Sequence, residues 1–133
     1  MREYLFRGKT KQGEWVYGSL DISYQHSVYP MIRVHDKALS YNAKEVILES
    51  IGQYTEVTVK DDVRLFEGDI VNGAEFNGSY AHGKVVYYHG AFVVFPIGRF
   101  LEGLRELSYA TKQLTVIGNV VDNPELIEGQ TKE

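Results

Sequence analysis

The 133-residue chain contains no cysteine. It therefore has no disulfide framework, no thiol nucleophile and no thiolate metal site, and this composition fits a cytosolic protein. No apolar run approaches the roughly 20 residues that a membrane-spanning helix needs. The first four residues also lack the apolar core of a signal peptide. We therefore expect a cytoplasmic protein, without membrane contact, whose length fits a single domain.

The chain also has fewer positively than negatively charged residues. The chain has 14 Lys and Arg against 18 Asp and Glu, for a formal net charge of −4. Proteins that bind nucleic acid mainly through phosphates are normally basic, so nucleic acid is not the favoured partner. The first eleven residues are nevertheless locally basic, with Arg2, Arg7, Lys9 and Lys11. These charges fit either a solvated hairpin edge or an arm that contacts phosphates, with Arg7, Lys9 and Lys11 as the candidate nucleic-acid contacts.

Motifs that carry chemistry are missing as well. No serine lies in a nucleophile elbow, no histidine pair has metal-ligand spacing, and no phosphate-binding loop is complete. Glu67 and Asp69 lie close together, but acidic residues in a turn more often cap the backbone than act as a catalytic pair. We therefore predict no catalytic residue, no metal and no cofactor, and a protein that is not an enzyme.

The residues that are abundant favour strands. The chain has ten Tyr, six Phe and thirteen Gly, a composition typical of short strands joined by tight turns. Residues 4–7 and 15–20 flank a polar connector and predict one hairpin. Residues 83–88 and 91–95 flank His89-Gly90, which suits a type I′ turn, and predict a second. Further strands are predicted at 31–35, 52–59 and 113–121.

Together these patterns predict a mainly β fold with few short helices. The segment 60–122 is expected to form a small SH3-like barrel, extended by the β-hairpin strands of residues 1–59. Residues 72–80 hold two Asn-Gly dipeptides and are expected to form a mobile loop. Residues 128–133 are expected to be a disordered tail.

Two segments leave alternatives open. Within residues 42–51, Asn42 followed by Glu45 suits a helix start, whereas the other alternative is a strand through 45–47 and a tight turn. Residues 100–107 have apolar side chains at helical spacing interrupted by Gly103, so a short helix and an extended crossing both fit. Beyond them, Pro124 suits the first position of one helical turn.

Three short motifs have turn chemistry. Gly68 suits a positive φ, and Asp69 can accept a hydrogen bond from the backbone downstream of it. Gly118, inside a strand, predicts a bulge or a close backbone approach. Gln53 and Tyr54 are expected to join a structural polar network, with ligand binding as the alternative.

Four motifs and the first strand occur in the order seen in the YopX family of phage- and prophage-encoded proteins. The motifs are Gly52-Gln53-Tyr54-Thr55, Glu67-Gly68-Asp69 with the strand after it, Gly118-Asn119 within its strand, and the Asn-Pro-Glu-Leu of 123–126. The chain resembles this family over about residues 2–127, and we expect residues 1–127 to form one YopX-like domain. It departs from the family in residues 56–62, where a Gly-rich turn is common, and at Leu48, where Pro often occurs.

The resemblance implies a phage or prophage protein in the cytoplasm of a bacterial host, and it supplies no catalytic residues. The function we favour is that of a non-enzymatic accessory protein that binds its own subunits, another protein or a host factor. The aromatic content and the apolar hairpin 83–95 favour a homo-oligomer. The alternative is a nucleic-acid-binding small barrel that stacks bases on Tyr80, Tyr87, Tyr88 or Tyr109.

Overall fold

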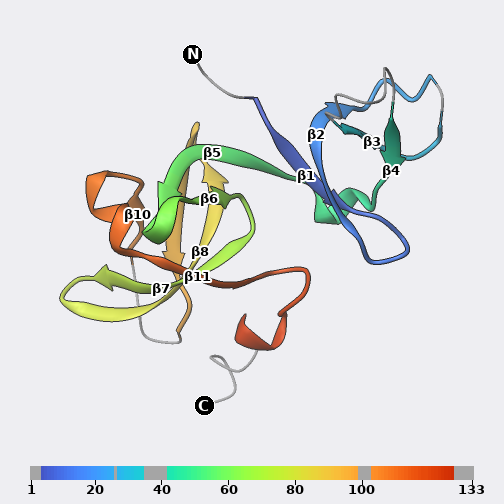
Figure 1. The fold of residues 1–133 in the computed structure, drawn as a ribbon. Coiled ribbons are helices and arrows are strands. Elements are labelled where there is room, and N and C mark those ends of the chain that lie inside the picture. The colour runs from blue at the N-terminus through green and yellow to red at the C-terminus, as the bar shows by residue number, and fades with distance from the viewer. Residues whose placement is uncertain (1–3, 26, 35–41, 99–102, 128–133) are drawn as a thin grey trace. The chain divides into compact units, whose positions relative to one another are not determined.

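The structure, a computed structural model, describes residues 4–25, 27–34, 42–98 and 103–127 (Figure 1). It is mainly β, as predicted, with its strands in two antiparallel sheets. Contacts along the chain define two compact units, residues 1–54 and residues 55–133, and each is described by itself. Arg2 and the tail 128–133 lie outside the described residues.

The N-terminal unit is a sheet in which β1 and β2 form the predicted first hairpin. Lys9 lies opposite Trp15, and Phe6 lies opposite Gly18. The side chains of Val16, Ile32 and Val46 form the core of the unit. The strand order is β4-β3-β2-β1-β5. Its first four strands are β1 (Phe6–Lys9), β2 (Trp15–Asp21), β3 (Met31–Val34) and β4 (Ala43–Glu45).

The ambiguous segment 42–51 is a strand and a turn, so the helix alternative is wrong. Strand β4 pairs with β3, with Glu45 opposite Met31, and a single 3₁₀ turn, η1 (Leu48–Ser50), follows. Val46 is buried directly against Gly8, where an added Cβ would lie 2.9 Å from the Cβ of Val46. Sheet pairing and this burial outweigh the local helix-capping signal.

Strand β5 (Gly52–Val59) begins in the N-terminal unit and ends in the C-terminal one. Its first residues pair with β1, and its neighbour in the C-terminal unit is β6 (Val63–Phe66). Glu56 has a φ of 71°, a left-handed backbone conformation inside the strand. The Thr55 hydroxyl donates to the Leu65 carbonyl at 2.8 Å and accepts from the Val57 N–H at 3.2 Å. Thr55 therefore stabilises the backbone on either side of Glu56 through its side chain.

The C-terminal unit contains a five-stranded sheet with the order β10-β9-β8-β7-β11. Its core includes Leu65, Val71, Val85 and Val94. Among the described residues the strands form no closed barrel, so the SH3-like part of the prediction is not confirmed. The strands of this sheet are β7 (Asp69–Phe76), β8 (Ser79–Tyr88), β9 (Ala91–Pro96), β10 (Arg105–Glu106) and β11 (Thr115–Asn119).

The prediction of a loop at residues 72–80 is wrong. Strands β7 and β8 continue through it as one long hairpin closed by Asn77-Gly78, with φ values of 51° and 88°. The first Asn-Gly does not turn the chain. Gly73, with a φ of 91°, instead lies in a bulge where the register shifts between Val71 and Ala74. A positive φ can serve a bulge as well as a turn, and the sequence does not separate the two.

The predicted second hairpin, β8 and β9, is confirmed with the expected turn, since His89 and Gly90 have φ values of 50° and 86°. Of the segment 100–107, residues 100–102 lie outside the described residues. The remainder holds the short strand β10 rather than a helix. The predicted last strand begins later than expected, since a 3₁₀ helix, η3 (Tyr109–Gln113), precedes β11. The short helical turn predicted around Pro124 is present at 125–127.

Candidate functional site

The turn between β6 and β7, with the first residue of β7, holds three of the sequence motif residues. Gly68 has a φ of 95°, its N–H donates to the Val85 carbonyl, and its carbonyl accepts from the Val120 N–H, both at 2.9 Å. Asp69 is 2% exposed, and its Oδ2 accepts from the Phe66 N–H at 2.7 Å. Asp69 therefore accepts a backbone hydrogen bond, as predicted, and this donor lies upstream of it. Glu67, directly before Gly68, is partly buried.

Replacing Asp69 by Ala is expected to lower the free energy of unfolding by about 2 kcal/mol, because a buried N–H loses its charged acceptor. Asp69→Asn is the matched control, since it keeps an acceptor oxygen at nearly the same volume, and should cost clearly less. Urea denaturation of the two variants measures both values. Equal stability of Asp69→Ala and the unchanged protein would contradict this role.

The second turn lies after β11. The register with β7 shifts between Val116 and Gly118, and a Cβ at Gly118 would lie 2.4 Å from Asn123 Oδ1. The predicted bulge and close approach are both present. Asn119 Oδ1 accepts from the N–H groups of Val121 and Asp122 at 3.0 and 2.8 Å. These residues shape the backbone.

The remaining motif residues lie on β5. Gly52, Tyr54 and Thr55 are buried, and Gln53 is partly buried. Gly52 and Gln53 lie opposite Arg7 and Phe6 of β1.

One face of the N-terminal hairpin combines cations with aromatic rings. Residues directly opposite each other in an antiparallel pair share a face, so Arg7, Lys9, Trp15 and Tyr17 lie together. We call these four residues the basic face. The Arg7 Cζ is 4.9 Å and the Lys9 Nζ is 6.0 Å from the centre of the Trp15 ring. Arg7 is only 7% exposed, so of the predicted nucleic-acid contacts it is the least accessible.

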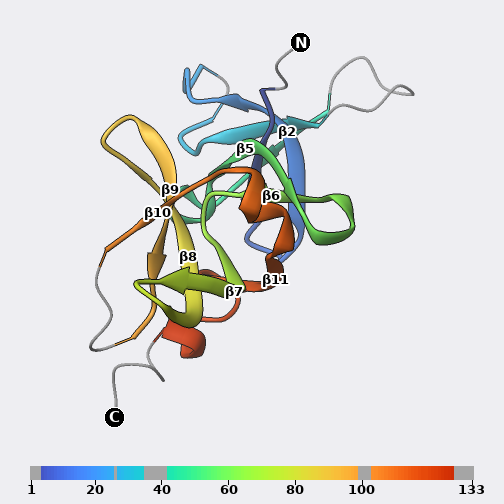
Figure 2. The same cartoon turned by 90° about the vertical axis from the view of Figure 1, so that its left-hand side faces the viewer.

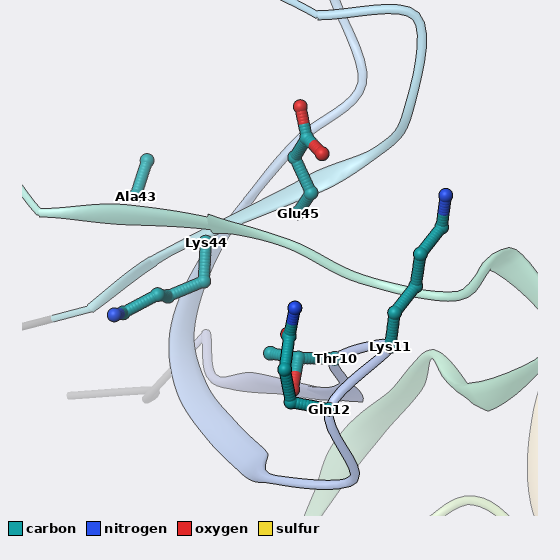
Figure 3. Close-up of a pocket in the computed structure, with 6 residues that line it drawn as sticks. All are labelled: Thr10, Lys11, Gln12, Ala43, Lys44 and Glu45. Carbon is teal, nitrogen blue, oxygen red and sulfur yellow. The ribbon is translucent and has the colours of Figure 1, made fainter.

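Lys11 lies in the hairpin turn, beside a shallow pocket. Its Nζ is 4.0 Å from the centre of the Tyr29 ring. A hydrogen bond with Tyr29 raises the pKa of the Lys11 amine; desolvation opposes this rise, and the charges of Tyr29 and Glu45 add to it. Figure 3 shows Lys11 and Glu45 extending to the same side and Lys44 extending the other way. The pocket measures about 200 Å³ and is lined by Thr10, Lys11, Gln12, Ala43, Lys44 and Glu45.

Aromatic side chains lie at the turn end of the β8–β9 hairpin, whose backbone is drawn in yellow and gold in Figure 2. Tyr87 is 58% exposed and Tyr88 is 44% exposed. The rings of Tyr87 and Phe92 meet edge-on at 5.1 Å, and so do those of Tyr88 and Phe95. The His89 ring lies 4.0 Å from that of Tyr88. We call these five residues the aromatic tip; its two ring pairs lie on opposite faces of the hairpin, Tyr87 with Phe92 on one and Tyr88 with Phe95 on the other.

The aromatic tip carries no formal charge, in a unit that is otherwise acidic. Residues 85–98 contain no Asp, Glu, Lys or Arg. Residues 1–54 hold seven Lys and Arg against six Asp and Glu, whereas residues 55–133 hold seven against twelve. The aromatic tip is therefore an uncharged region within an acidic unit, whereas residues 1–54 are close to electrically balanced.

Some of these residues were predicted from the sequence and others were not. Tyr80 is exposed, at 76%, near the start of β8, away from the aromatic tip at the end of the strand, and the side chain of Tyr109 lies outside the described residues. Trp15, Tyr17 and Tyr29 were not anticipated beside Lys9 and Lys11. The predicted first strand ended at residue 7, which would place Trp15 opposite Arg7, whereas β1 extends to Lys9 and pairs Lys9 with Trp15.

The described residues contain neither a candidate metal cluster nor a candidate membrane-spanning helix. No group of three or more His, Asp or Glu side chains is arranged to hold a metal ion there. No helix within the described ranges has the length and apolar character required to cross a membrane.

Comparison with known proteins places the chain in a family. The model of the YopX protein family matches residues 5–128, nearly the whole chain, so the protein belongs to the YopX family and the predicted resemblance is confirmed. Its fold is similar to that of the crystal structure of protein EF1440 from Enterococcus faecalis. That similarity has a TM-score of 0.56 and 20% sequence identity, and covers 96% of this chain and 99% of the other. No curated protein matches the sequence.

Proposed function

We propose that this YopX-family protein is a non-enzymatic phage or prophage accessory protein that binds protein, and that a second copy of the chain is its first partner. The observation that carries the proposal is the aromatic tip. Exposed tyrosines supported by neighbouring rings are typical of protein interfaces, since they bury a large apolar area with little loss of side-chain entropy. The ring pairs of Tyr87 with Phe92 and of Tyr88 with Phe95 hold this surface in place.

The absence of charge at the aromatic tip favours a second copy as the occupant. The C-terminal units of two copies are both acidic and repel each other. The repulsion is smallest where the contacting segment carries no charge. Residues 85–98 are such a segment. A two-fold dimer also requires a patch that is complementary to itself, and aromatic rings that pack edge-on satisfy this requirement.

The experiment compares the association of three proteins by light scattering on a sizing column at micromolar concentration. The unchanged chain is expected to elute as a dimer, and the double variant Tyr87→Ser/Tyr88→Ser is expected to associate at least about tenfold more weakly. Both side chains are largely exposed, so the stability of the fold should change little.

Tyr80→Ser is the matched control, because Tyr80 lies on the same strand and is even more exposed, at 76%, but lies away from the aromatic tip. It should associate like the unchanged chain. A monomeric unchanged chain, or a dimer that the double variant leaves intact, would overturn the proposal.

A further inference from the structure

We infer that the basic face of the N-terminal hairpin, together with Lys11 and Arg33, binds single-stranded nucleic acid. The inference concerns the N-terminal unit alone and is independent of the proposed dimer. Three cations of one short hairpin lie over aromatic rings. Arg7 and Lys9 lie over the Trp15 ring, and Lys11 lies over the Tyr29 ring.

The strand register extends this face across β3. Tyr17 lies opposite Arg7, and two residues further along β2, Ser19 lies opposite Arg33, so Arg33 points to the same side as Tyr17. Arg33 is exposed and its Nη2 lies 3.5 Å from Asp21 Oδ2. The ion pair is open to solvent, and an incoming phosphate can compete with the carboxylate for the guanidinium. The core side chains of Val16 and Ile32 point to the opposite side of the sheet.

The chemistry of this face matches an unpaired strand more closely than a duplex. Single-stranded binders combine a basic track for phosphates with aromatic rings on which bases stack. Trp15 is partly exposed and Tyr17 is 44% exposed, so both can offer part of a ring to a base. Lys9 and Lys11 supply the charges for the phosphates, while the buried Arg7 positions the Trp15 ring.

The distribution of charge between the two units also favours the N-terminal unit as the part that binds nucleic acid. Residues 55–133 carry twelve acidic against seven basic side chains, which opposes a polyanion near the exposed tyrosines of β8. Residues 1–54 carry a slight excess of positive charge. The stacking surface is therefore assigned to Trp15 and Tyr17 rather than to Tyr80, Tyr87 or Tyr88.

The test measures fluorescence anisotropy of a labelled oligodeoxythymidine of about 15 nucleotides, a length that spans one such site. Binding at low salt is expected to weaken with a log–log slope of about −2, which corresponds to roughly three phosphate contacts. Trp15 is the only tryptophan of the chain, so a base stacked on it should also quench the intrinsic fluorescence of the protein.

The variant Lys9→Gln/Lys11→Gln is expected to lose at least about tenfold in affinity and more than half of the salt slope. Lys60→Gln/Lys112→Gln, which removes two exposed lysines of the acidic unit, is the matched control and should bind like the unchanged chain. Trp15→Leu should weaken binding with little change in the salt slope, because it removes stacking rather than charge.

Three results would overturn the inference. The first is absence of binding even at low salt. The second is equal binding by the lysine variant and its control. The third is equal affinity for a duplex, or for polyglutamate of the same charge, since that would mean attraction by charge without stacking. None of these results bears on the dimer, which is measured without nucleic acid.

Discussion

Replacing Gly18 by Ala is expected to destabilise the N-terminal unit by about 3 kcal/mol or more. Gly18 lies in the middle of β2, opposite Phe6 of β1 and Val34 of β3. A Cβ added there would lie 2.0 Å from the carbonyl oxygen of Arg33 and 2.8 Å from its carbonyl carbon. Backbone atoms of a paired strand cannot rotate away as a side chain can, so β2 and β3 must separate.

Hydrogen exchange of the β2 and β3 amides, together with urea denaturation, measures this effect. Gly73→Ala is the control, because its φ of 91° strains an alanine while nothing lies within 4 Å of the added Cβ. Backbone strain alone is expected to cost about 1–2 kcal/mol. The free energy of unfolding could fall by the same amount in both variants while the β2 and β3 amides of Gly18→Ala remain protected from exchange. That result would contradict the close approach of the two strands at Gly18.

The second large effect is expected for Leu65→Ala, which should lower the free energy of unfolding by about 3–4 kcal/mol. Leu65 is completely buried, and it packs with Val59, Val71, Val85 and Leu114 in the core of the C-terminal unit. Truncation removes apolar contacts and leaves a cavity that the surrounding strands fill only in part.

The matched control is Val63→Ala, two residues earlier on β6, where the side chain is 45% exposed. Its cost should stay below about 1 kcal/mol. Thermal and urea denaturation of the two variants give the comparison. A Leu65→Ala protein as stable as Val63→Ala would contradict the position of Leu65 in the core.

Local chemistry was enough to predict the elements that depend on it. The turns at Gly68 and at His89-Gly90 require positive φ values, and few residue types adopt these at low cost. The bulge near Gly118 was predictable for a similar reason. The structure adds what no local pattern contains, namely that this glycine is needed because Asn123 Oδ1 occupies the space of a side chain.

Long-range pairing decided the elements that the sequence left open or predicted wrongly. The segment 42–51 has a helix-start pattern, but pairing with β3 and burial of Val46 against Gly8 impose a strand. The segment 72–80 has two turn signals, and only the pairing of β7 with β8 shows that the first marks a bulge. In both cases the deciding contacts join different segments of the chain. The strand or helix preferences of single residues therefore say little about them.

The candidate surfaces were predictable in part for the same reason. Composition and spacing indicated the basic residues Lys9 and Lys11 and the apolar hairpin 83–95. The rings of the basic face come from β2, and only the strand register places them beside Arg7 and Lys9. The Tyr29 ring beside Lys11 comes from the segment before β3. The exposure of Tyr87 and Tyr88 also depends on how far the β8–β9 hairpin extends beyond the core of the C-terminal unit. No local sequence pattern determines that extension.

The most direct test of the central claim is the mass of the unchanged chain in solution, measured by sedimentation equilibrium across the micromolar range. The account predicts a concentration-dependent rise to twice the mass of one chain, because the aromatic tips of two copies pack together. A single monomer mass at every concentration would contradict it.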